Sequence, residues 1–101
     1  MILSNMNEFI FNERLTLTTV CEQRLSLRHF IEHNAEEMPM VLNLSLVQHS
    51  DSAGLALMIE ALRFARQLKK EILFKAVPEQ MISMMRFCNV LPLFKEEKWI
   101  N

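Results

Sequence analysis

Apolar and polar residues follow two different spacings along the chain, and the changes of spacing predict the elements. Apolar residues three or four positions apart predict helices. Short apolar runs with β-branched residues, bounded by polar turn residues, predict strands. By these rules the predicted strands are residues 8–12, 15–18, 40–47 and 71–77, and the predicted helices are residues 19–34, 52–69 and 78–89.

The expected order, β-β-α-β-α-β-α, is that of an α/β fold. Residues 40–47 begin with an apolar run that leaves no polar face, so we expect a central strand of a covered sheet. The β-α-β unit at residues 40–77 predicts a parallel pair with a right-handed crossover. The first two strands, separated by a turn at residues 12–14, predict a hairpin-like pair. We therefore expect a mixed sheet of four strands, or of five.

Length and composition limit this fold to a single domain over residues 1–101, with a core at about residues 8–94 and a charged tail at residues 95–101. Half of the residues are apolar, which is enough for a core without a structural metal. The 11 basic and 12 acidic residues leave no positive excess. Nucleic-acid binding is not expected, because it needs a concentrated basic face.

The sequence predicts a cytoplasmic protein. Residues 1–9 lack the cationic and apolar regions of a secretory signal. The longest uninterrupted apolar segment, residues 55–59, is far shorter than the roughly 20 residues of a membrane helix, so direct membrane insertion is not expected. Cys21 and Cys88 have no metal-type spacing, and we expect two reduced thiols.

No group of residues indicates catalysis, and we expect no cofactor and no metal. A helix would place His29 and His33 on one face, but a zinc site needs further ligands. His49 stands beside Ser50 and Asp51, whereas the members of a catalytic triad normally come from separate elements. The single glycine lies in no phosphate-binding loop. A small enzyme that uses His49, or a metal at His29 and His33, is therefore the least favoured hypothesis.

The most informative segment joins the third predicted strand to the following helix. We call it the corner; its residues are Asp51, Ser52, Ala53 and Gly54. The Asp51 carboxylate can cap the helix by accepting hydrogen bonds from free N–H groups of the first turn. Ser52 then presents a hydroxyl near the surface. A helical glycine costs roughly 0.5–1 kcal/mol relative to alanine, so Gly54 indicates a close approach, either of the sheet or of a partner chain.

Five successive apolar residues, Leu55 to Ile59, follow the corner and cover every face of one helical turn. One face of this turn must pack on the sheet, and a chain this short has too few other elements to cover all of its remaining faces. We therefore expect an exposed apolar patch that docks a partner, with Leu55 and Met58 joining the corner in the predicted partner-binding site. The methionines of the last predicted helix extend this patch or fill the core; they are Met81, Met84 and Met85.

Several segments together resemble the STAS domain family. Residues 41–47, followed by the D-S-A-G-L run that begins at Asp51, are similar to the family's buried strand and its D-[ST]-x-G-L helix start. Residues 73–78 are similar to its L-x-N-V-P segment, residues 85–94 to its C-terminal ending, and residues 15–20 to its opening. The resemblance covers nearly the whole chain. It implies a STAS-like fold and a protein that binds partners without catalysis.

Two departures from the family pattern bear on function. Asn43 stands where the family usually has aspartate. Ala53 occupies the position of the serine that is phosphorylated in the family's anti-sigma-factor antagonists, and alanine cannot be phosphorylated. The serine directly after Asp51, Ser52, is instead similar to the hydroxyl residue at this position in MlaB-like members, which are the STAS subunits of Mla-type phospholipid ABC transporters.

The resemblance to these members implies a regulatory or assembly subunit that binds the cytosolic ATPase of an ABC transporter, in phospholipid trafficking between Gram-negative membranes. It implies a location at the inner membrane's periphery through the transporter complex, and it leaves open a homodimer within that complex. The alternative is an anti-sigma-factor antagonist, a partner-switching signalling protein. Its candidate phosphorylation site is Ser52, or Ser50, because Ala53 carries no hydroxyl; a phosphate on Ser52 would lie near a helix N-terminus.

Overall fold

The computed structural model describes residues 7–34, 39–95 and 99–100. The strands are β1 (Glu8–Ile10), β2 (Arg14–Leu15), β3 (Met40–Asn43), β4 (His49–Ser50), β5 (Ile72–Lys75) and β6 (Trp99–Ile100). The helices are α1 (Val20–His33), α2 (Ser52–Gln67), α3 (Glu79–Phe87) and α4 (Leu91–Lys95). The predicted alternation of strands and helices in an α/β domain is confirmed, and β4, α4 and β6 are additional elements.

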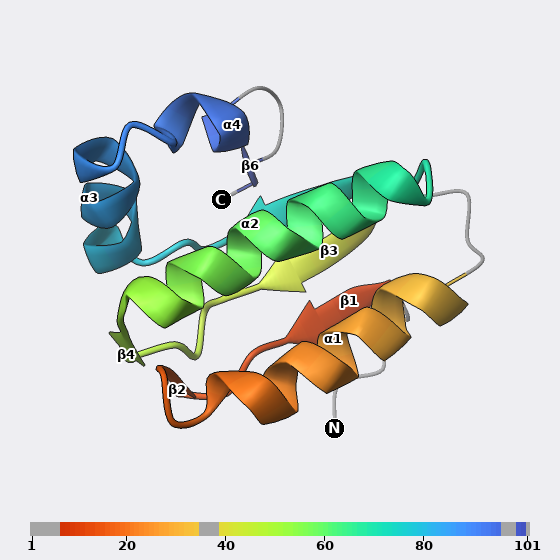
Figure 1. Ribbon diagram of the computed structural model, residues 1–101, viewed down its shortest axis with the longest axis horizontal. Coiled ribbons are helices and arrows are strands. Elements are labelled where there is room, and N and C mark those ends of the chain that lie inside the picture. The colour runs from red at the N-terminus through yellow and green to blue at the C-terminus, as the bar shows by residue number, and fades with distance from the viewer. Residues whose placement is uncertain (1–6, 35–38, 96–98, 101) are drawn as a thin grey trace.

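The main sheet consists of four parallel strands in the order β1-β3-β5-β6. β3 has a neighbour on each side: Leu42 is opposite Phe9 of β1 and opposite Phe74 of β5. The predicted central position of this strand is therefore confirmed. Helices α1 and α2 lie side by side over one face of the sheet (Figure 1), and α3 packs against α2.

The prediction of a mixed sheet with a hairpin-like opening pair is wrong. β2 pairs in parallel with β4 in a separate two-stranded sheet, with Leu15 opposite Ser50, and does not pair with β1. The cause is local. The Asn12 N–H donates to the Gln23 side chain on α1 (3.1 Å), so the chain leaves β1 toward that helix instead of folding back on the strand.

Two predicted strands are shorter in the structure because their ends turn. β3 stops at Asn43, before the predicted end at residue 47, because the Asn43 Oδ1 accepts from the Ser45 N–H (2.8 Å) and bends the backbone. β5 stops before Ala76, whose φ of 58° lies in the left-handed region. Pro78 was predicted to be the first residue of this helix, but it is the N-cap of α3. Asn89, just beyond α3, has a left-handed backbone conformation (φ 61°), which asparagine tolerates at the end of a helix.

The core lies between the main sheet and the helices. Its largest fully buried side chains are Phe11, Phe74, Phe94, Leu15, Leu27, Ile31, Met40, Leu42, Leu44, Met58, Ile72 and Met81. Phe94 of α4 packs on Phe74 of β5, with ring centroids 5.1 Å apart. Residues 99–100 of the predicted tail are not a loose extension, because β6 pairs with β5. Within the described ranges, no helix is both long and apolar enough to span a membrane.

Candidate functional site

The corner lies where β4 meets α2, and Asp51 holds it together. The predicted helix cap is confirmed: the Asp51 Oδ1 accepts from the Ala53 N–H (2.9 Å). The second carboxylate oxygen accepts from the Leu17 N–H (3.1 Å), which belongs to the turn before α1. The bond from Leu17 is the main cause that lowers the pKa of Asp51; burial opposes it and the bond from Ala53 adds to it. The carboxylate therefore stays ionised at neutral pH.

The turn at residues 16–19 is fixed by its own threonine side chains. The Thr16 N–H donates to the Thr19 Oγ1 (3.0 Å), and that hydroxyl donates to the Arg14 carbonyl (2.9 Å). Gln23 donates to the same carbonyl from α1 (2.9 Å). Thr19 is the N-cap residue of α1, but its hydroxyl is engaged in the turn and makes no cap bond to the helix. These bonds hold Leu17 outward, with 73% of its surface exposed.

Gly54 is explained by contact within the chain. A Cβ at this position would stand 2.6 Å from the Leu15 carbonyl oxygen and 3.1 Å from the Leu15 Cγ. The first of these is a backbone atom of β2, which cannot move aside alone. Of the two alternatives that the sequence left open, close packing of strand on helix accounts for the glycine, and no partner chain is needed to explain it.

The predicted apolar docking patch at residues 55–59 is wrong. Leu55 is 4% exposed and Met58 is fully buried, so both belong to the core beneath the corner. Helix α2 contacts β4, α1 and α3, so neighbouring elements cover its apolar faces from several sides. Two methionines of α3, Met81 and Met85, are likewise fully buried. Leu55 and Met58 are therefore placed to support a binding surface from below.

A small exposed surface remains at the corner, and we call it the docking face; its residues are Leu17, Ser52 and Ala56. Ser52 and Ala56 are exposed one helical turn apart on α2. Leu17 is adjacent through the hydrogen bond that its N–H donates to Asp51. Sequence reasoning missed Leu17 because it took residues 15–18 for a strand. The available signal was the Thr-Leu-Thr-Thr run, since threonine side chains often stabilise turns.

The residues considered for catalysis do not form a reactive group. The Ser50 Oγ is buried and has no hydrogen-bond partner in the described structure, so the neighbouring His49 does not activate it. His29 and His33 stack with ring centroids 4.1 Å apart. In the described ranges, no three or more metal-ligating side chains come together.

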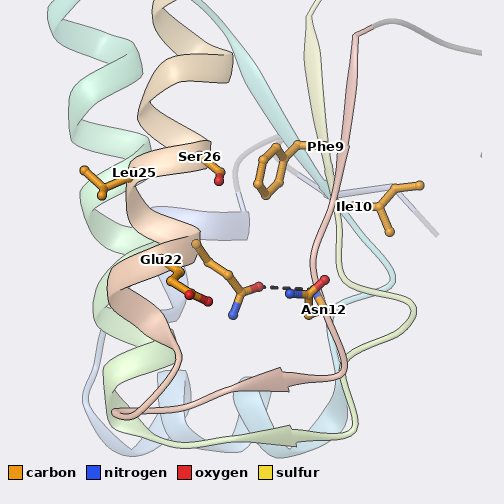
Figure 2. Close-up of a pocket in the computed structure, with 7 residues that line it drawn as sticks. Phe9, Ile10, Asn12, Glu22, Leu25 and Ser26 are labelled. Atoms are coloured by element: carbon orange, nitrogen blue, oxygen red, sulfur yellow. Dashed lines mark hydrogen bonds between the residues drawn. The ribbon is translucent and has the colours of Figure 1, made fainter.

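A hollow of about 560 Å³ lies between α1 and the edge strand β1 (Figure 2). Phe9 points into this space from β1, and Gln23 reaches across from α1 to the backbone of Asn12, whereas Leu25 points away. Glu22 is the one titratable residue in its lining. A single carboxylate provides no acid–base pair, so this hollow does not indicate an active site.

Asn43, the departure from the family's aspartate, has a structural explanation. Its Nδ2 donates to the Glu8 Oε2 on the adjacent strand (2.6 Å), while its Oδ1 holds the turn after β3. Lys75 on β5 lies 3.8 Å from the same Glu8 oxygen. An aspartate at position 43 would place a second carboxylate against Glu8, so the neutral amide suits this neighbour.

Comparison with known proteins agrees with the geometry of the corner. A family model described as "Mlab, STAS domain" matches residues 14–91, from β2 to the first residue of α4. A search of curated proteins finds no match. The matched region contains the cap, the glycine contact and the exposed serine, and domains of this family are generally non-catalytic. The chain therefore belongs to the MlaB-like STAS domain family.

Proposed function

We propose that this chain is a non-catalytic regulatory and assembly subunit that binds the cytosolic ATPase of an ABC transporter for phospholipid trafficking between Gram-negative membranes. The match to the MlaB-like family model carries this proposal. The exposed Ser52 hydroxyl beside Ala53 supports it, because a serine to be phosphorylated is absent from position 53. In this proposal the protein is cytoplasmic and reaches the inner membrane only through its partner.

The docking face is suited to binding a protein partner because its backbone is held in place before the partner binds. Asp51 bonds both to the turn that carries Leu17 and to the first turn of α2. Gly54 allows β2 to lie directly against that helix. A surface fixed in this way loses little conformational entropy on association. Its small side chains, Ser52 and Ala56, allow a partner to approach α2 closely.

Binding to the ATPase subunit tests the proposal. We expect Ser52→Arg to weaken co-purification and equilibrium binding by at least tenfold, because the long side chain blocks close approach. Ser26→Arg is the matched control, since Ser26 is an exposed serine on α1 outside the docking face. Circular dichroism verifies that both variants are folded. Undiminished binding by folded Ser52→Arg would contradict the assignment of the docking face.

One observation keeps the anti-sigma-factor antagonist as a second candidate: the Ser52 hydroxyl is exposed at the start of α2 and is accessible to a kinase. Electrostatics oppose it, because a phosphate there would lie beside the ionised Asp51 carboxylate. Ser50 is buried and offers no accessible alternative. Intact-mass measurement after incubation with the kinase of a partner-switching system separates the two candidates. We expect no added phosphate; stoichiometric phosphate on Ser52 would favour the antagonist.

A further inference from the structure

A second surface feature lies on the outer side of α1 and α2, which run side by side (Figure 1). It is a groove of about 370 Å³. We call it the arginine groove; its lining residues are Arg28, Glu60, Arg63, Phe64 and Gln67. Arg63 follows Ser52 by eleven residues on α2, or about 16 Å along the helix axis at 1.5 Å per residue. Glu60 of the groove lies one helical turn after Ala56 of the docking face, so the two surfaces adjoin on α2, whereas Arg28 and Arg63 belong to the groove alone.

Positive charge is in excess in and around this groove. Glu60 is engaged by Arg24, whose Nε lies 2.8 and 2.9 Å from the two carboxylate oxygens. This bond is the main cause that lowers the pKa of Glu60; burial opposes it, and the charges of Arg24, Arg28 and Arg63 add to it. Three arginines thus surround one carboxylate. Arg24 neutralises Glu60, and two positive charges remain without a matching carboxylate.

The two remaining guanidinium groups keep donors available. The Arg28 guanidinium lies 4.1 Å from the centroid of the Phe64 ring, which holds its plane over the aromatic face. Its nearest contact with Glu60 is 3.8 Å, which is longer than a hydrogen bond. Arg63 makes no hydrogen bond or ion pair with any residue that the structure describes. Holding these like charges together is unfavourable unless an anionic group joins them.

We propose that the arginine groove binds an acidic segment of a protein partner. The guanidinium groups of Arg28 and Arg63 present planar forks that match carboxylates, and the Phe64 ring beneath Arg28 holds the first of these forks in place. The chain as a whole carries a net charge of −1, so attraction of an acidic peptide requires a local excess of positive charge, as this groove has. Two surplus cations are too few for the phosphate-rich surface of a nucleic acid. The inference is independent of the identity of the partner at the docking face.

The direct test uses the whole chain and a labelled eight-residue peptide of alternating glutamate and leucine, followed by fluorescence anisotropy at low ionic strength. We expect saturable binding that the double variant Arg28→Gln, Arg63→Gln weakens at least tenfold. Arg66→Gln is the matched control, because Arg66 is an exposed arginine of α2 that does not line the groove. It is expected to change binding less than twofold.

Further arms identify the chemistry. A peptide with glutamine in place of glutamate should not bind. A higher salt concentration should weaken the binding of the acidic peptide, because salt screens exposed charges. Ser52→Arg should leave peptide binding unchanged, so failure of the docking face and failure of the groove are distinguishable. Absence of peptide binding, equal binding by the double variant, or binding to anionic phospholipid vesicles but not to the peptide would each overturn the proposal.

Discussion

The two halves of α2 carry two surfaces of different design. At the corner, the Asp51 carboxylate is paired within the chain, because it accepts from Leu17 and Ala53, and the space beside Gly54 is taken by Leu15. In the arginine groove, by contrast, Arg28 and Arg63 share the single carboxylate of Glu60 with Arg24, which holds it in hydrogen bonds.

Under the two proposals, one helix presents two modes of recognition. The docking face offers shape and apolar contact, which salt affects little. The arginine groove offers net charge, which acts over a longer range and is screened by salt. Changes at Asp51 and Gly54 should therefore act on stability and on partner binding together, whereas changes in the groove should act on anion binding with little effect on folding.

The largest expected effect is that of Gly54→Ala. The new Cβ would meet the Leu15 carbonyl oxygen at 2.6 Å, so β2 or α2 must shift. Overpacking of this kind costs about 2–3 kcal/mol, which exceeds the roughly 1 kcal/mol that alanine gains over glycine in a helix. Urea unfolding measures the change. Ala56→Gly, at an exposed site of the same helix, controls for propensity. An unchanged or raised stability of Gly54→Ala would contradict the close packing of β2.

Asp51→Ala should have the next largest effect, because it removes the cap and the acceptor for the Leu17 N–H together. Loss of a helix cap costs about 1–2 kcal/mol of unfolding free energy. Ser26→Ala, at an exposed position outside the corner, is the control. If Asp51→Ala unfolds at the same urea concentration as the wild type, the corner is not held by this carboxylate.

The contribution of Asp51 should also depend on pH. Its pKa is lowered in the folded state, so its stabilisation is fully present above the unfolded value near 3.9 and is lost as pH falls through the folded pKa. The stability difference between wild type and Asp51→Asn should therefore be constant from about pH 5 to 7 and shrink below pH 4. A difference that grows on acidification would have the wrong sign.

Leu17→Ser should separate recognition from folding at the corner. Leu17 is 73% exposed, so the change in unfolding free energy should stay within about 0.5 kcal/mol. Binding to the ATPase subunit, measured by titration calorimetry, should nevertheless weaken about fivefold, because an exposed apolar contact is removed. Leu25→Ser removes an exposed leucine from α1 and is the control. Equal binding by both variants would exclude Leu17 from the docking face.

The smallest effect is expected from Glu60→Gln in the arginine groove. Removing this carboxylate releases Arg24 and raises the local positive charge, so the acidic peptide should bind roughly two- to fivefold more tightly, as for a single exposed ion pair. Glu32→Gln on α1 is the control, since Glu32 does not line the groove. Weaker binding would show that Glu60 serves to position the arginines and would break the simple contrast between the two surfaces.

Sequence reasoning predicted the elements well and their pairing less well. The cap at Asp51 and the left-handed Asn89 follow from local preferences, which a short segment determines. The hairpin of residues 8–12 and 15–18 was wrong, because the partner of β2 lies in β4, more than thirty residues away. The apolar turn was wrongly expected on the surface, because the elements that cover it are known only once the chain is folded.

For the two surfaces, the division between sequence and tertiary structure is clear. The sequence alone predicted a helix that begins at Ser52, a capping carboxylate, an exposed serine hydroxyl and an alanine at position 53. Tertiary structure alone decided that Gly54 accommodates Leu15, that Leu17 joins the docking face, and that Arg28 meets Arg63 across a groove. The physical reason is that caps act within one turn, whereas these contacts join segments that only packing of the helices on the sheet brings together.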